Sequence, residues 1–134
     1  MRLVIGLISC VCVALFVGAC KKPAPMDRGA ALYETLCQSC HGRDGAGAHG
    51  VYAPLAGTPV PNGDPAKMLA WVLYGERPAL LPRGQFAGVM PQFGFLSDED
   101  AAAVTTHVRH SFGNAAAPID AAMVAAVRAT HPGR

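Results

Sequence analysis

The stretch Cys37-Gln38-Ser39-Cys40-His41 constrains this chain more than any other. Two thiols stand three positions apart, and an imidazole directly follows the second. This spacing matches the attachment site of a c-type haem, where each thiol bonds to the porphyrin edge and the histidine binds iron from one face. A thioredoxin-like redox pair needs a βαβ context, and a zinc site needs a second pair of ligands, whereas no cysteine follows Cys40. The motif therefore predicts one covalent haem c, attached through Cys37 and Cys40, with His41 as an axial iron ligand.

The N-terminus has the features of an export signal. Arg2 precedes an apolar run over residues 3–19, which is interrupted only by Ser9 and closes on small residues. This pattern predicts a secretory signal peptide over residues 1–19. As a helix the seventeen-residue run would span roughly 26 Å, so an uncleaved N-terminal membrane anchor is the alternative.

The end of this run resembles a bacterial lipobox. The letters VGAC over residues 17–20 place small residues before Cys20, which predicts lipidation of Cys20 and a lipoprotein held at a membrane. Residues 20–26 contain two prolines and are expected to form a short tether. The scheme accounts for all five cysteines, because two leave with the signal, one is acylated and two bind haem. None remains for a disulfide.

The remaining sequence predicts helices separated by loops. Apolar runs follow N-terminal caps, and the expected helices cover residues 27–37, 66–74 and 98–112, with a last one ending near residue 129. Their caps are Asp27, Asp64, Ser97 and Asp120. Residues 42–63 and 76–96 are rich in glycine and proline, which predicts loops. Because no stretch alternates as strands do, the expected fold class is all-α.

This layout resembles a class I c-type cytochrome, and in particular the small bacterial mono-haem cytochromes. The resemblance covers residues 27–114 and includes PLAG at 54–57, GVMPQF at 88–93 and LSD at 96–98. It implies the cytochrome c fold, with three main helices around one covalent haem, as a domain over residues 27–114. A short C-terminal helix then belongs to an extension over residues 115–134.

The resemblance implies Met90 as the second axial iron ligand. Met90 lies forty-nine residues after His41, and Pro91 restricts its backbone to an extended conformation. A thioether sulfur is soft and neutral, so it favours Fe(II) and raises the reduction potential. Met68 occupies a helical core position and is expected to pack there. The resemblance also implies that a backbone carbonyl, here that of Ala53, orients the ring of His41.

Four histidines are possible rivals of Met90. His49 follows a glycine-rich loop and His131 lies near the C-terminus, so both are expected to be solvated. His107 and His110 lie on a predicted helix. The resembled family has an aromatic residue where His107 stands, packed against the position of Gly29, so His107 is expected to be a packed imidazole.

These observations predict an electron carrier rather than an enzyme. Its expected partners are redox proteins, namely a dehydrogenase as donor and an oxidase or nitrite reductase as acceptor. Its expected location is the periplasmic side of a bacterial membrane. The formal net charge of +2 is uninformative about nucleic acid, and there is no basic tract beyond Lys21-Lys22. Neither a nucleic-acid partner nor a small-molecule substrate is expected. The alternatives are a haem sensor or peroxidase-like enzyme with an exchangeable sixth ligand, and the electron-relay subunit of a membrane dehydrogenase complex.

Overall fold

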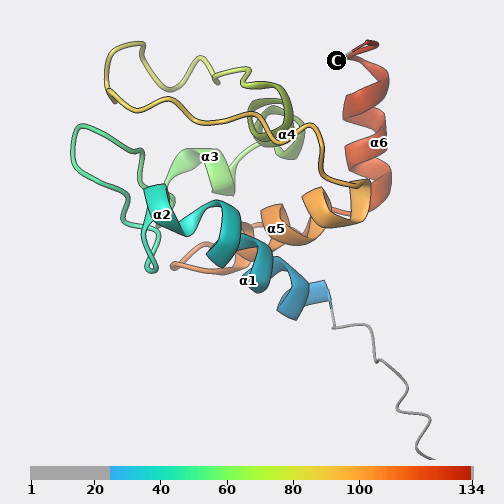
Figure 1. Ribbon diagram of the computed structural model, residues 1–134, viewed down its shortest axis with the longest axis horizontal. Coiled ribbons are helices and arrows are strands. Elements are labelled where there is room, and N and C mark those ends of the chain that lie inside the picture. Colours follow the sequence, from blue (N-terminus) through green and yellow to red (C-terminus); the bar gives the residue numbers. More distant parts are fainter. Residues whose placement is uncertain (1–24, 134) are drawn as a thin grey trace, which may run out of the picture.

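The computed structural model describes residues 25–133, where the chain is helical (Figure 1). The helices are α1 Pro25–Leu36, α2 Gln38–His41, α3 Pro59–Asn62, α4 Pro65–Tyr74, α5 Asp98–His110 and α6 Ala121–Ala129. Within residues 25–133 the only β contact is an isolated bridge between Ala48 and Tyr52. The expected all-α class is therefore confirmed. The predicted signal peptide and the lipidation site Cys20 lie outside the described residues.

Three of the four predicted helix caps are confirmed. The side chains of Asp64, Ser97 and Asp120 accept hydrogen bonds from first-turn backbone N–H groups of α4, α5 and α6, at 2.9, 3.1 and 2.8 Å. Such bonds satisfy backbone donors that have no partner within the helix. Gly75 ends α4 in the left-handed conformation, with φ of 73°. None of the helices within residues 25–133 is long and apolar enough to cross a membrane.

The first and third helices differ from expectation. Helix α1 begins at Pro25, so Asp27 lies inside it instead of capping it. A proline is tolerated there because the first turn of a helix leaves its N–H groups unpaired. Helix α3 is a single turn within a stretch expected to be a loop, and it too begins at a proline.

Helix α5 ends two residues before the expected Phe112. Ser111 is extended, and Phe112 takes a positive φ of 59°. This turn lets the Phe112 ring pack at 5.1 Å from the ring of Tyr33 on α1. The packing of Phe112 against α1 therefore replaces a last helical turn.

Helices α1 and α5 pack against each other (Figure 1), and their backbones approach closely at Gly29. A Cβ atom on Gly29 would overlap the carbonyl oxygen of Ala103 and would lie 2.9 Å from the Cβ atom of His107. Helix α6 packs on α4 and α5, and Leu69 and Val124 are fully buried between them. This framework leaves the α1–α2 junction facing the loop over residues 76–96.

Candidate functional site

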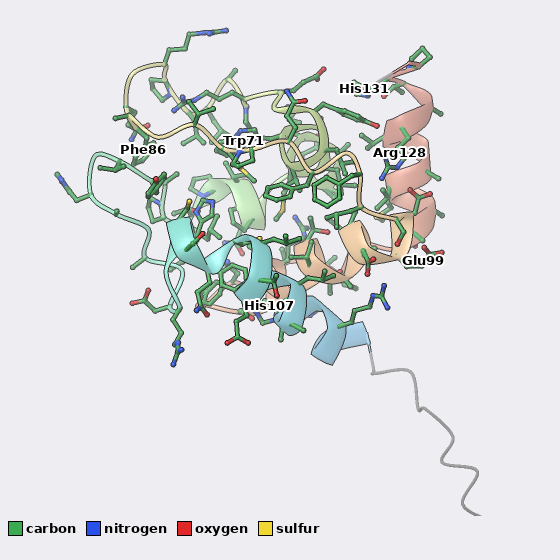
Figure 2. The ribbon with its side chains drawn as sticks, in the orientation of Figure 1. Trp71, Phe86, Glu99, His107, Arg128 and His131 are labelled. Atoms are coloured by element: carbon green, nitrogen blue, oxygen red, sulfur yellow. The ribbon has the colours of Figure 1, made fainter. Side chains whose placement is uncertain are left out.

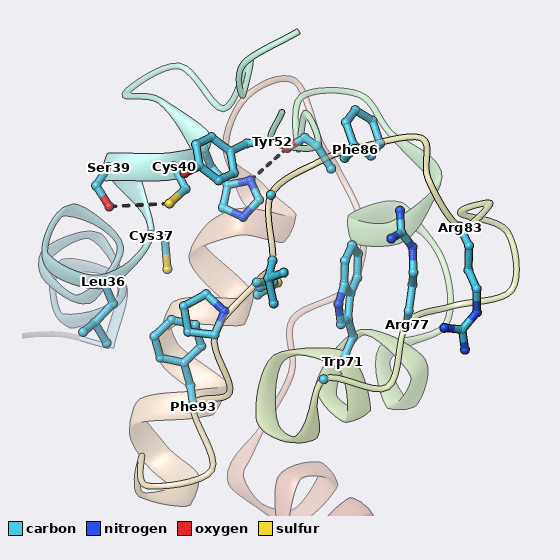
Figure 3. Close-up of a pocket in the computed structure, with 17 residues that line it drawn as sticks. Leu36, Cys37, Ser39, Cys40, Tyr52, Trp71, Arg77, Arg83, Phe86 and Phe93 are labelled. Atoms are coloured by element: carbon cyan, nitrogen blue, oxygen red, sulfur yellow. Dashed lines mark hydrogen bonds between the residues drawn. The ribbon is translucent and has the colours of Figure 1, made fainter. Parts of the chain in front are cut away.

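A cavity of about 330 Å³ opens between the α1–α2 junction and the loop over residues 76–96 (Figure 3). Four residues that the sequence singled out line it: Cys37, Cys40, His41 and Met90. An apolar extension of about 40 Å³ shares three of them and reaches the core at Met68. The fold therefore brings together two segments that lie far apart in the sequence.

The thiols are placed by a short helix. The carbonyl oxygen of Cys37 accepts the N–H groups of Cys40 at 3.2 Å and of His41 at 2.9 Å, which closes the single turn of α2. Helix α1 delivers Cys37 to this turn, and its last residue, Leu36, also lines the cavity. Burial, with a smaller contribution from Cys40, raises the pKa of the Cys37 thiol to about 11. Both cysteines are free thiols in the described part of the chain.

The ring of His41 is buried and held in one orientation. Only 8% of His41 is exposed, and its Nδ1 lies 2.8 Å from the carbonyl oxygen of Ala53. Because a carbonyl only accepts, Nδ1 carries the proton and donates, which leaves the Nε2 lone pair free for a metal. Burial lowers the pKa of His41 against the opposing effect of this bond, so the neutral imidazole is favoured. The contact with Ala53 confirms what the resemblance implied.

Met90 is half-buried on the opposite segment. Before Met90, a hydrogen bond holds the loop in place: the N–H of Gly88 donates to the carbonyl of Val51 at 2.8 Å. After Met90, a second hydrogen bond holds the loop: the N–H of Phe93 donates to the carbonyl of Val72 at 2.9 Å. Met90 lines both the cavity and its apolar extension, so its thioether is available to a group that fills the cavity.

Met68 is buried in the core, as expected, with 5% of its surface exposed. It lines only the apolar extension, not the main cavity. The two methionines thus differ in access, and Met90 is the one at the cavity wall.

The far edge of the cavity is cationic and aromatic. Figure 3 shows Trp71, Arg77 and Arg83 together on the side away from the cysteines. The Nε of Arg77 donates to the carbonyl of Leu81 at 3.1 Å, which fixes that side chain. None of the described residues that line this cavity is acidic. Sequence reasoning missed both arginines, because they lie in a glycine- and proline-rich loop that has no motif to mark them.

The rival histidines lie away from the cavity, since none of the four is among the described residues that line it. His49 is exposed, as expected. His107 is a packed imidazole, also as expected, with its ring 5.4 Å from that of Tyr33 (Figure 2). The expectation for His131 was wrong. Its ring stacks on Tyr74 at 4.4 Å, and its Nε2 lies 3.0 Å from Glu76 Oε1.

The residues of this cavity fit a covalently attached haem. Two thiols stand at one edge, a neutral imidazole and a thioether line the walls, and cations suited to carboxylates stand at the other edge. Apolar and aromatic side chains, including Trp71 and Phe93, form much of the remainder. This donor set matches the ligation of a six-coordinate haem iron.

Comparison with known proteins gives the same family. The family model described as cytochrome C oxidase, cbb3-type, subunit III, matches residues 24–108. The chain is 39% identical over 110 residues to the fructose dehydrogenase cytochrome subunit of Gluconobacter japonicus, covering 75% of this chain and 22% of that protein. It is 34% identical over 92 residues to cytochrome c-552 of Thermus thermophilus, covering 65% and 70%. It is 36% identical over 91 residues to the cytochrome c subunit of the quinone alcohol dehydrogenase of Gluconobacter oxydans, covering 64% and 18%.

Proposed function

This chain belongs to the c-type cytochrome family as an electron-transfer protein with a covalently bound haem c, and we propose that Cys37, Cys40, His41 and Met90 hold that haem. The observation that carries the proposal is the shared cavity. His41 and Met90 are forty-nine positions apart in the sequence, yet they line one volume together with the two thiols. An imidazole nitrogen and a thioether sulfur are the donors that such a haem iron takes.

Haem c supplies a one-electron couple between Fe(II) and Fe(III). The role of His41 is to present Nε2 in a fixed orientation, because its Nδ1–H is held by the carbonyl of Ala53. The role of Met90 is to present a neutral sulfur that favours the reduced state. Because hydrogen bonds hold both His41 and the loop that carries Met90, these side chains would move little when the haem gains or loses an electron, which suits rapid electron exchange.

The cationic edge has a separate role in the proposal. Arg77 and Arg83 would hold the haem carboxylates, and the hydrogen bond from Arg77 to Leu81 keeps one guanidinium in place. Trp71 and Phe93 line the cavity and would exclude water from a haem bound there. A low local polarity strengthens the electrostatic effect of each fixed group on the reduction potential.

An electron carrier is favoured over a peroxidase-like enzyme or a ligand-exchange sensor. A peroxidase needs acid–base side chains near an open iron position. The described residues lining the cavity include one imidazole, that of His41, and no carboxylate. A sensor of the expected kind needs a histidine near Met90, whereas the rival histidines lie elsewhere among the described residues.

The proposed partners are redox proteins, with a dehydrogenase as the leading donor. The names of two relatives describe cytochrome subunits of dehydrogenases. The chain spans about a fifth of the length of those two relatives. On the strength of their names, the electron-relay subunit of a membrane dehydrogenase complex is the second form of the proposal. Lipidation at Cys20 would place the carrier on the periplasmic side of a membrane. Capture of partners from solubilised membranes, compared between wild type and Cys20→Ala, tests both the partner class and the location.

The ligand assignment is tested by a matched pair of substitutions. Met90→Ala should abolish the weak near-infrared sulfur-to-iron band of the oxidised protein. Met68→Ala removes an equally sized but buried side chain, so it should keep the band while lowering the free energy of unfolding by about 2–5 kcal/mol. Loss of the band in Met68→Ala and its survival in Met90→Ala would overturn the assignment.

A further inference from the structure

We propose that helix α6 positions the methionine side of the cavity through Arg128. This inference rests on the proposed role of Met90 as an iron ligand. Arg128 is not among the residues that line the cavity, so it acts through the backbone that carries Met90. It is therefore a positioning residue.

The guanidinium of Arg128 fastens the segment that leads from the loop into α5. Its Nη1 donates to the carbonyl of Gly94 at 3.0 Å and its Nη2 to the carbonyl of Leu96 at 2.5 Å. Its Nε donates to Asp98 at 2.7 Å. Figure 2 shows Arg128 projecting from α6 toward this segment. One planar guanidinium group thus joins α6 to every second residue of this segment, namely Gly94, Leu96 and Asp98.

The fastened segment is close to Met90 in the sequence. Gly94 follows Met90 by four residues, with Pro91 and Phe93 between them. Proline has a fixed φ, and Phe93 is buried with its N–H bonded to the carbonyl of Val72. Pro91 and the held Phe93 restrict the chain between the guanidinium contacts and Met90, so we infer that a shift of the Gly94 carbonyl is passed on to Met90.

The segment just after this helix contacts the start of the loop. Just beyond α6, the ring of His131 stacks on Tyr74, the last residue of α4, and its Nε2 lies 3.0 Å from Glu76 Oε1. Helix α6 and the residue two positions after it thus touch both ends of the loop over residues 76–96. These contacts fix both ends of the loop that carries Met90.

The strength of the Arg128 contacts makes them suited to this role. Hydrogen bonds from a charged donor are roughly twice as strong as neutral ones. Arg128 and Asp98 are only 26% and 33% exposed, so water competes less than at an open surface. Without the guanidinium, the two carbonyls turn to water and the segment after Met90 gains freedom. The sulfur would then leave its position more often, and small external ligands would enter the cavity faster.

The test uses the haem-loaded protein and a matched control. Arg128→Met keeps the length of the side chain and removes its charge and donors. Arg28→Met does the same to the Arg28–Asp100 pair, which joins α1 to α5 and has comparable exposure, 36% and 17%. We expect the rate of cyanide binding to the oxidised protein to rise about tenfold in Arg128→Met, equivalent to about 1.4 kcal/mol. The near-infrared sulfur-to-iron band should weaken in the same variant, and Arg28→Met should leave both unchanged.

A milder variant keeps the test decisive if Arg128→Met fails to fold. Arg128→Lys retains a charge beside Asp98, but a single ammonium cannot make both hydrogen bonds to the carbonyls of Gly94 and Leu96. It should raise the cyanide rate to an intermediate value and should speed hydrogen exchange of the Phe93 amide. Wild-type cyanide rates in every folded Arg128 variant, or an equal increase in Arg28→Met, would overturn the positioning role. A wild-type protein that itself lacks the sulfur-to-iron band would instead refute the ligation by Met90, and the inference with it.

Discussion

The two sides of the cavity are built in different ways. On the histidine side, the two thiols and His41 lie within five consecutive residues, and the carbonyl that orients the ring comes from Ala53, only twelve residues later. On the methionine side, a loop without helix or strand carries Met90, and it is held by hydrogen bonds to Val51, to Val72 on α4 and to Arg128 on α6. The first side is encoded locally, whereas the second depends on tertiary contacts. Substitutions distant from the cavity should therefore act unequally on the two sides.

The largest effect should come from breaking the local side. Cys37→Ser combined with Cys40→Ser removes both thiols that would bond to the porphyrin, so no pigment should stay with the polypeptide after extraction with acid and organic solvent. Cys20→Ser is the matched control, since it removes a thiol outside the motif and should leave the pigment attached. Pigment retained by the double variant would refute the attachment site.

A smaller effect should follow from crowding the crossing of α1 and α5. Gly29→Ala would force a Cβ atom onto the carbonyl of Ala103, and we expect the free energy of unfolding to fall by about 1–3 kcal/mol. Helix propensity alone predicts the opposite sign, a gain of about 1 kcal/mol. Urea unfolding therefore decides between them.

The exposed neighbour provides the control for this substitution. Ala30→Gly should cost about 1 kcal/mol through propensity alone. Neither variant should change the near-infrared band, because the crossing lies on the histidine side. A weakened band in Gly29→Ala would show that the two sides are more strongly coupled than their contacts suggest.

The smallest expected effect concerns pH. Burial lowers the pKa of His107 below its usual 6.5, so below that value the unfolded chain binds more protons than the folded one. Stability should therefore decrease as the pH falls below about 6.5. His107→Phe should make the free energy of unfolding, measured by urea titration, less dependent on pH between 7 and 5. An unchanged pH dependence would show that His107 titrates alike in both states.

Sequence reasoning succeeded where the determinants are local. The caps at Asp64, Ser97 and Asp120 involve groups within three residues of one another, so the sequence predicts them directly. The contact of His41 with Ala53 was implied by the family resemblance and is present.

It failed where distant residues decide the outcome. His131 stacks on Tyr74, fifty-seven positions earlier, and a chain terminus gives no signal for such a contact. The two hydrogen bonds from Arg128 to the carbonyls of Gly94 and Leu96 likewise depend on how α6 lies against α5. The early end of α5 follows from the packing of Phe112 on Tyr33 across two helices. Each of these features requires the tertiary arrangement.

Helix α1 also holds its own N-terminal end, at Pro25, away from the cavity. Its twelve residues make it about 18 Å long, with Pro25 at one end and Leu36, which lines the cavity, at the other. An electrode or vesicle linked through the Pro25 end would therefore meet the molecule about one helix length from the cavity wall. Immobilisation at that end leaves clearance for a second protein to exchange electrons at the opposite end of the helix.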